Sequence, residues 1–312
     1  MTIGIVFPGQ GSQSVGMGQQ LAKAFPEAQH IFQEVDDALD YKLSQIIFEG
    51  PQEDLTLTQN TQPALMAVSL AIMRVLASQA KIDISKFSLT AGHSLGQYSA
   101  LAAANSLSVA QAARLLKIRG ESMQKAVAVG KGAMVAVLGA DMETVKKVAD
   151  EASNHGICTI ANDNCPGQVV LSGEKVAIDK VAEIAKDHGV KRCISLPVSA
   201  PFHCNLMQPA AEAMEKALIT TELLNPSIPV VDNTTVSPVT DGQEMKGLLI
   251  KQVTGQVRWR ETIEYFQQQG IGRVYEVGNG KVLTGLFKKT APEIVCTPIA
   301  TPEDIEELVK NF

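Results

Sequence analysis

A serine flanked by two glycines constrains this chain more than any other stretch. Residues 92–96 read Gly-His-Ser-Leu-Gly and match the G-x-S-x-G pattern, which has a mechanical meaning only where a strand enters it and a helix leaves it. Residues 87–91 are short and apolar, as in a buried strand, and residues 98–105 are rich in Ala and Leu, as in a helix. In such a turn the serine hydroxyl stands at a helix N-terminus, where free N–H groups stabilise an oxyanion. The pattern indicates a nucleophilic Ser94; the alternative is a glycine-rich loop that matches by chance.

The composition is that of a globular protein. The 312 residues are 45% hydrophobic and 19% charged, enough for a large core and a deep cleft. The net charge of −6 argues against nucleic acid or an anionic membrane as the main partner. Five cysteines without a C-x-x-C pair predict free thiols in a reducing compartment. The N-terminus lacks a basic leader and no run of 18 apolar residues occurs, so we expect a cytoplasmic protein without a membrane span.

Strands alternate with helices along most of the chain, which predicts an α/β fold with a mainly parallel sheet covered on both faces. Between residues 133 and 196 the order becomes β-α-β-β-α-β, the ferredoxin-like pattern. We therefore predict a large α/β-hydrolase-like catalytic domain from residues 1–127 and 199–312. Residues 128–198 form a small ferredoxin-like domain inserted into it.

One long helix is expected to be buried, because the apolar residues of 64–79 lie almost all round it. Asn60 or Thr61 is expected to cap it, with Pro63 in its first turn.

The glycine-rich segment 8–18 follows the first predicted strand. It is not a dinucleotide site, because the third glycine of G-x-G-x-x-G falls on Ser14. A loop that lets the backbone and Gln10 approach a ligand is one interpretation, and a turn with a surface glutamine is the other.

A nucleophilic serine needs a base at neutral pH, and the chain has five histidines. Three of them lie among polar residues and are expected at the surface: His30, His155 and His188. His93 adjoins Ser94, but adjacent side chains on a sharp turn diverge. His203 remains, downstream of the serine as in α/β hydrolases, unless it is a loop histidine without a catalytic role.

No acid between Ser94 and His203 falls at the end of a predicted strand of the main sheet. All but Glu121 lie in the small domain, and Glu121 lies within a predicted helix. This suggests a dyad in which another acceptor, such as a backbone carbonyl, orients His203.

Arg119 lies in a helix that Ser108 is expected to cap. The sequence by itself favours a solvated helix charge. The alternative is an interior arginine that binds a carboxylate bidentately.

Six motifs occur in one order, at residues 7–13, 61–64, 92–96, 119–120, 164–168 and 201–203. In this order they resemble bacterial malonyl-CoA:acyl carrier protein transacylases and, more distantly, the acyltransferase domains of polyketide synthases. The resemblance runs from residue 3 to about residue 290. It implies transfer of malonyl from malonyl-CoA to the phosphopantetheine thiol of holo acyl carrier protein in fatty-acid biosynthesis, without a cofactor. The serine motif by itself also fits a serine esterase or thioesterase of similar fold.

The resemblance also implies roles for single residues. Ser94 would be the nucleophile, and His203 the base and then the acid. Gln10 and the backbone N–H of Leu95 would form the oxyanion hole. Arg119 would hold the malonyl carboxylate.

Further positions match those around the same pocket. Gln252 matches the residue whose backbone carbonyl orients the histidine, which agrees with the missing acid. Four others match pocket residues: Gln62, His93, Asn162 and Asn164. Gln97 departs from the pattern, since many relatives have glutamate there; because it lies just past the serine turn, we expect little effect on the chemistry.

The implied reaction sets demands on specificity and docking. A buried arginine left unpaired is costly, so acetyl groups should be rejected, and Phe202 and Met123 could crowd an added α-methyl group. The carrier proteins of this family are acidic, so an acidic enzyme must dock them through a local basic patch. The candidates are Lys191, Arg192, Lys281, Lys288 and Lys289; the alternative is scattered lysines that only aid solubility.

Overall fold

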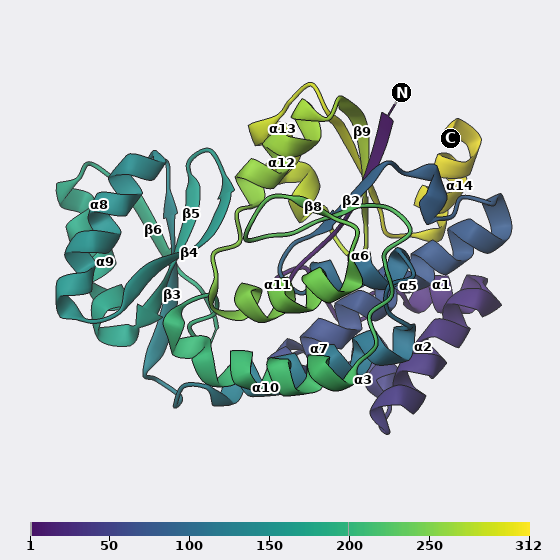
Figure 1. Cartoon of the computed structure of the whole chain (residues 1–312), viewed down its shortest axis with the longest axis horizontal. Helices are drawn as coiled ribbons and strands as arrows, with labels where there is room; N and C mark the ends of the chain where they lie inside the picture. Colours follow the sequence, from purple (N-terminus) through teal and green to yellow (C-terminus); the bar gives the residue numbers. More distant parts are fainter. Residues whose placement is uncertain (1, 199) are drawn as a thin grey trace.

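The computed structural model describes residues 2–198 and 200–312, which form two sheets (Figure 1). The larger sheet has the order β10-β9-β1-β2-β7-β8. Its strands are β1 (Thr2–Phe7), β2 (Leu89–Gly92), β7 (Val230–Val231), β8 (Pro238–Val239), β9 (Ile271–Val277) and β10 (Val295–Ile299). All neighbouring pairs are parallel except β7 with β8. The predicted α/β fold with a mainly parallel sheet is confirmed.

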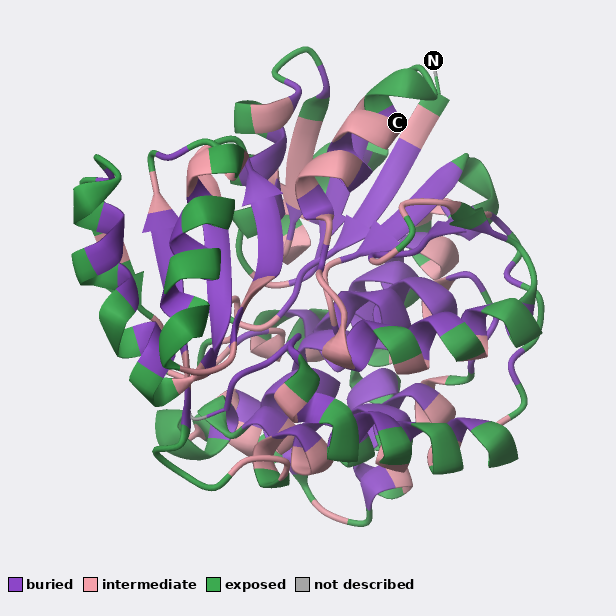
Figure 2. Cartoon of the chain, turned by 60° about the vertical axis from the view of Figure 1, so that its left-hand side comes forward, coloured by how far each residue is buried: buried purple, intermediate pink, exposed green. Residues whose placement is uncertain are grey.

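Helices cover the larger sheet on both faces, and the side-chain alternation of β1 shows how. Ile5 and Phe7 belong to the main core, and Val6 belongs to a second core that contains Trp259 and Phe287. The covering helices are α1 (Gln19–Ala24), α2 (Pro26–Leu39), α3 (Leu43–Glu49), α4 (Gln52–Thr56), α5 (Thr58–Ala80), α6 (Gly96–Ala103), α7 (Val109–Lys125), α10 (Gln208–Thr220), α11 (Gly242–Thr254), α12 (Trp259–Gln268), α13 (Val282–Thr290) and α14 (Pro302–Asn311). Of these, α12 and α13 supply the second core. Figure 2 shows most strands buried and the exposed residues on the outer sides of helices.

The smaller sheet is antiparallel with the order β4-β5-β3-β6. Its elements are β3 (Gly132–Leu138), α8 (Met142–Ala152), β4 (Cys158–Cys165), β5 (Gln168–Glu174), α9 (Lys175–Asp187) and β6 (Arg192–Ser195). This is the predicted β-α-β-β-α-β order, and we call these elements the ferredoxin-like unit. Strand β4 packs against α12 and α13, two of the helices that cover the larger sheet.

The long helix α5 differs from the prediction. It begins at Thr58 rather than Ala64, and Pro63 lies inside it. The expected caps are wrong because their side chains bind the preceding helix α4 instead: Asn60 Nδ2 donates to the Asp54 carbonyl (2.8 Å) and Thr61 Oγ1 to the Leu55 carbonyl (2.6 Å). By length and composition α5 could cross a membrane, but 72% of its most apolar window is buried inside the protein, as in a core helix.

Candidate active site

The serine motif forms a tight turn between β2 and α6. Ser94 has φ 53°, an uncommon left-handed conformation for a residue other than glycine. A Cβ atom on Gly92 would lie 1.9 Å from the carbonyl of Gly96, and one on Gly96 would lie 2.4 Å from the Phe7 oxygen. Both glycines are therefore required for the strand, the turn and the helix to approach each other this closely.

Ser94 and His203 are in hydrogen-bond contact. The distance from Ser94 Oγ to His203 Nε2 is 2.7 Å, and His203 Nδ1 lies 2.9 Å from the backbone oxygen of Gln252 in α11. Because a carbonyl only accepts, Nδ1 carries the proton and donates, which leaves Nε2 to accept from the serine hydroxyl. His203 is itself held at φ 58°. Burial, with help from the charge of Arg119, lowers the pKa of His203 to about 3, so the ring is neutral and able to act as a base at pH 7.

Arg119 is buried, with 1% of its surface exposed, so the interpretation as a solvated helix charge is wrong. Its Nη1 donates to Gln62 Oε1 (2.8 Å), and its Nη2 donates to Gln252 Oε1 (3.1 Å) and Ser94 Oγ (3.1 Å). Its Nε has no partner, and no carboxylate in residues 2–198 or 200–312 forms an ion pair with it. Burial lowers the pKa of Arg119. A buried guanidinium with only neutral acceptors is suited to bind an anion.

Helix packing explains why Arg119 is inside. A Cβ atom on Gly120 would lie 2.6 Å from Gln59 Cα, so α7 packs very closely against α5 at this point. Arg119 follows Leu115 by four residues and precedes Met123 by four, and both neighbours are buried. This spacing was the sequence signal for an inward-facing arginine.

A cavity of ≈ 250 Å³ opens over the serine. Most of the predicted site residues line it: Gln10, Gln62, His93, Ser94, Leu95, Arg119, Asn162 and His203. Met123 and Phe202 contribute apolar surface, as does the segment 196–198 that follows β6. Leu95 precedes α6, and its N–H makes no hydrogen bond within the described part of the chain, so it is free to bind an oxyanion.

Asn164 and Gln252 do not line the cavity but bind residues that do. Asn164 Oδ1 lies 2.9 Å from His93 Nε2. Gln252 supports both His203 and Arg119, as described above. The three histidines expected at the surface are exposed.

Asn233 is a supporting residue that sequence reasoning missed. It follows β7, and its Oδ1 accepts from the Ser94 N–H (2.8 Å) while its Nδ2 donates to the Gly92 carbonyl (2.9 Å). One side chain therefore clamps both sides of the serine turn. Its only sequence signal was a polar residue at the carboxyl end of a short apolar strand.

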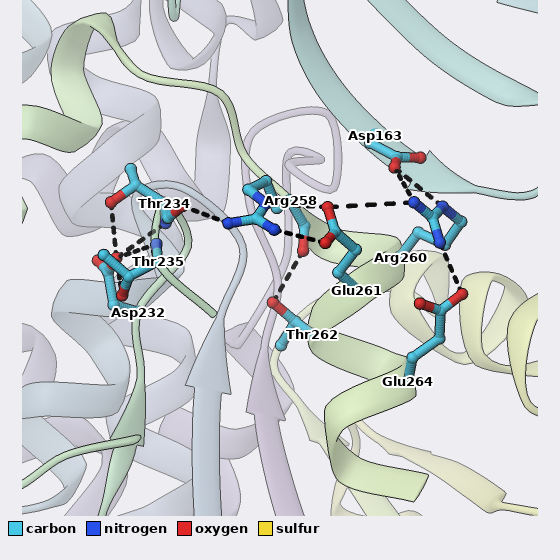
Figure 3. Close-up of polar contacts among 9 residues, drawn as sticks. All are labelled: Asp163, Asp232, Thr234, Thr235, Arg258, Arg260, Glu261, Thr262 and Glu264. Atoms are coloured by element: carbon cyan, nitrogen blue, oxygen red, sulfur yellow. Dashed lines mark hydrogen bonds and ion pairs between the residues drawn. The ribbon is translucent and has the colours of Figure 1, made fainter. Parts of the chain in front are cut away.

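Strand β4 carries Asn162 to the cavity and Asn164 to His93, and Asp163 between them fastens the strand. The Asp163 N–H donates to the Val257 carbonyl (3.0 Å), and its carboxylate lies 2.8 Å from Arg260 Nη2 in α12. Figure 3 shows Arg260 between Asp163 and Glu264. This ion pair holds the ferredoxin-like unit against the larger layers beside the cavity.

The five candidate docking cations are separated in the structure. Lys191 and Arg192 lie at the start of β6, whereas Lys281, Lys288 and Lys289 lie at the two ends of α13. Helix α13 packs against β4, at the opposite edge of the smaller sheet from β6. The five residues therefore do not form one cluster.

The chain is similar to known proteins over nearly its whole length. Residues 5–296 match the acyl transferase domain family. The chain is 42% identical over 311 residues to the malonyl CoA-acyl carrier protein transacylase of Bacillus subtilis, covering 99% of this chain and 97% of that protein. It is 41% identical over 297 residues to the transacylase of the same name from Escherichia coli, covering 95% of each.

Solved structures are similar over the whole chain. The acyl-carrier-protein S-malonyltransferase of Bartonella henselae has a TM-score of 0.97 at 49% identity, covering 100% of this chain and 99% of that one. A malonyl-transacylase solved in complex with its type II PKS acyl-carrier protein has a TM-score of 0.96 at 40% identity, covering 100% of both chains.

Proposed function

We propose that this chain, which belongs to the acyl transferase family, transfers malonyl from malonyl-CoA to the thiol of an acyl carrier protein through an ester on Ser94. One observation supports this best. A buried guanidinium that pairs with no carboxylate among the described residues lies 3.1 Å from a serine Oγ that a neutral histidine contacts at 2.7 Å. The site thus combines a nucleophile, a base and a receptor for a short acyl group that ends in a carboxylate.

In the first half-reaction His203 Nε2 takes the proton of Ser94 as Oγ attacks the thioester carbonyl. The oxyanion that forms receives hydrogen bonds from the Leu95 N–H and the Gln10 side chain, both of which line the cavity. The carbon–sulfur bond then breaks, and His203 returns its proton to the departing CoA sulfur. The product is malonyl-Ser94 with a neutral histidine.

The second half-reaction runs the same steps with the carrier's phosphopantetheine thiol. His203 accepts the thiol proton, the sulfur attacks the serine ester, and the proton goes back to Ser94 Oγ as the ester breaks. Because both thiols end phosphopantetheine arms, one groove serves both in a ping-pong cycle. Acyl transfer between a serine and two thiols needs no redox or group-carrying cofactor, so we assign none. We expect the cycle to run in the cytoplasm.

Arg119 gives the site its selectivity. Malonyl-CoA supplies a carboxylate that satisfies the guanidinium, and acetyl-CoA would leave it buried with neutral acceptors only. Asn162 and His93 complete the polar wall of the pocket, and Asn164 holds His93 from behind.

An esterase or thioesterase would also use the serine turn and the histidine, but it would not need Arg119. Steady-state assays with malonyl-CoA, with and without holo acyl carrier protein, separate the two. A transferase releases CoA quickly only when the carrier thiol is present and forms malonyl-carrier in equal amount. A hydrolase releases CoA and malonate at the same rate in both reactions, and that result would reject the proposed function.

A further inference from the structure

A continuous row of buried polar side chains runs from Asp232 to Arg119. Gln97 Nε2 donates to Asp232 Oδ2 (3.1 Å), Gln252 Nε2 donates to Gln97 Oε1 (2.7 Å), and Arg119 Nη2 donates to Gln252 Oε1 (3.1 Å). The first three side chains are fully buried, and Arg119 is 1% exposed. The row joins the buried Asp232 carboxylate to the buried Arg119 guanidinium through two amides. The carboxylate and the guanidinium form no ion pair with each other.

Surrounding groups fix the direction of both amides. Gln97 Oε1 also accepts from the Asn233 N–H (3.3 Å), while its Nε2 faces a carboxylate oxygen. Gln252 Nε2 also donates to the Ser94 carbonyl (3.2 Å) and to Asn233 Oδ1 (3.1 Å). Turning either amide round would place donors against donors and acceptors against acceptors. Both amides therefore point their oxygen toward Arg119 and their nitrogen toward Asp232.

The anionic end of the row is held firmly. Asp232 Oδ1 accepts from the N–H and the hydroxyl of both Thr234 and Thr235, at 2.7–3.0 Å. Figure 3 shows the two threonines gathered on this carboxylate. Oδ2 is left to receive Gln97 alone among the side chains of the described residues.

We propose that Gln97 and Gln252 relay the negative charge of Asp232 to Arg119 as aligned amide dipoles, so that the guanidinium stays charged while its substrate-facing side stays unoccupied. Aligned hydrogen-bonded dipoles in a low-dielectric interior strengthen one another and stabilise the charges at their ends. A carboxylate bonded directly to Arg119 would also stabilise it, but would compete with the carboxylate of the acyl donor. This inference rests on the proposed function and makes Gln97 a positioning residue, contrary to the small effect expected from the sequence.

The test exchanges the carboxylate and the amide at the start of the row. Gln97→Glu sets two carboxylates against each other, and Asp232→Asn removes the charge and sets two amide NH₂ groups against each other. The double variant restores one carboxylate and one amide. We expect each single change to raise KM for malonyl-CoA about 10-fold and the double variant to come within about threefold of the wild type.

Acetyl-CoA, the acyl donor without a carboxylate, distinguishes a role in carboxylate binding from a purely structural role. Acylation by acetyl-CoA should change less than about twofold in all three variants, because Ser94, His203, Asn233 and Gln252 are all retained and acetyl makes no use of the carboxylate receptor. The matched control is Gln33→Glu, which makes the same exchange at an exposed glutamine that donates to Asp37 (2.6 Å). This control variant should leave acylation by malonyl-CoA and by acetyl-CoA unchanged.

Three results would overturn the relay: unchanged KM for malonyl-CoA in the single variants, equal losses with both donors, or additive losses in the double variant. If Asp232→Asn does not fold, Gln97→Met decides the matter, since it removes the amide without adding charge. It should raise KM for malonyl-CoA but not for acetyl-CoA, and an unchanged or parallel response overturns the relay. Failure of the proposed function looks different, because the wild-type protein would then release CoA from malonyl-CoA at the same rate with and without holo acyl carrier protein.

Discussion

Arg119 Nη2 donates a 3.1 Å hydrogen bond to Ser94 Oγ, so the residue proposed to hold the substrate carboxylate touches the proposed nucleophile. The same Oγ lies 2.7 Å from His203 Nε2. A guanidinium only donates, so the serine proton is directed to the histidine. Nucleophile, base and carboxylate receptor therefore lie within one hydrogen-bonded group, which fits a short acyl chain.

Arg119→Met should remove selectivity rather than all activity. We expect kcat/KM for malonyl-CoA to fall about 100-fold or more, because the substrate carboxylate would be buried without a partner. Transfer from acetyl-CoA should be retained or increase. Parallel assays with the two donors measure this, and equal losses with both would contradict the carboxylate-binding role.

The activity should resist mild acid. Burial and, after it, the charge of Arg119 lower the pKa of His203 to about 3, so the base stays unprotonated as pH falls until the pH approaches that value. We expect kcat/KM for malonyl-CoA to show no acidic decline from about pH 8 to about pH 5. In Arg119→Met the decline of kcat/KM at acidic pH should move to higher pH, because the guanidinium charge no longer opposes protonation of His203. A decline centred near about pH 6.5 in the wild type would mean an unperturbed histidine.

The Asp163–Arg260 ion pair should stabilise the contact between the ferredoxin-like unit and the larger layers. Arg260→Gln leaves a buried carboxylate without its counter-charge, and we expect a loss of about 2 kcal/mol in the free energy of unfolding, since Arg260 is itself partly exposed. Glu264→Gln is the matched control. It removes one of the two partners of Arg260 within α12, Glu261 being the second, and should cost less than about 0.5 kcal/mol. Urea unfolding that gives equal losses for the two variants would show that the contact adds nothing.

Charge reversal at Lys288 and Lys289 tests carrier docking. Changing both to Glu should raise KM for the carrier protein about 10-fold at low salt and leave KM for malonyl-CoA unchanged. Reversal at Lys191 and Arg192 is the comparison, because they lie at the start of β6, at the opposite edge of the smaller sheet from the strand β4 that α13 contacts. If the Lys288 and Lys289 variant alters both KM values alike, these lysines serve CoA or have no role in docking.

Sequence could predict what short-range patterns determine. The serine turn, the capping of α7 by Ser108 and the ferredoxin-like order each depend on neighbouring residues, and the structure contains all three. The burial of Arg119 depends instead on how closely α5 meets α7. The links of Gln97 to Asp232 and of Asn233 to Ser94 join residues 135 and 139 positions apart, and they exist because β7 pairs with β2. No local pattern encodes such contacts.

In the proposed cycle Ser94 carries the malonyl group between two thiols. Intact-protein mass spectrometry after incubation with malonyl-CoA should show one malonyl group on the wild type and none on Ser94→Ala. The group should leave when holo acyl carrier protein is added and persist in buffer. A labelled Ser94→Ala protein, or equal loss of the label with and without the carrier, would contradict the account.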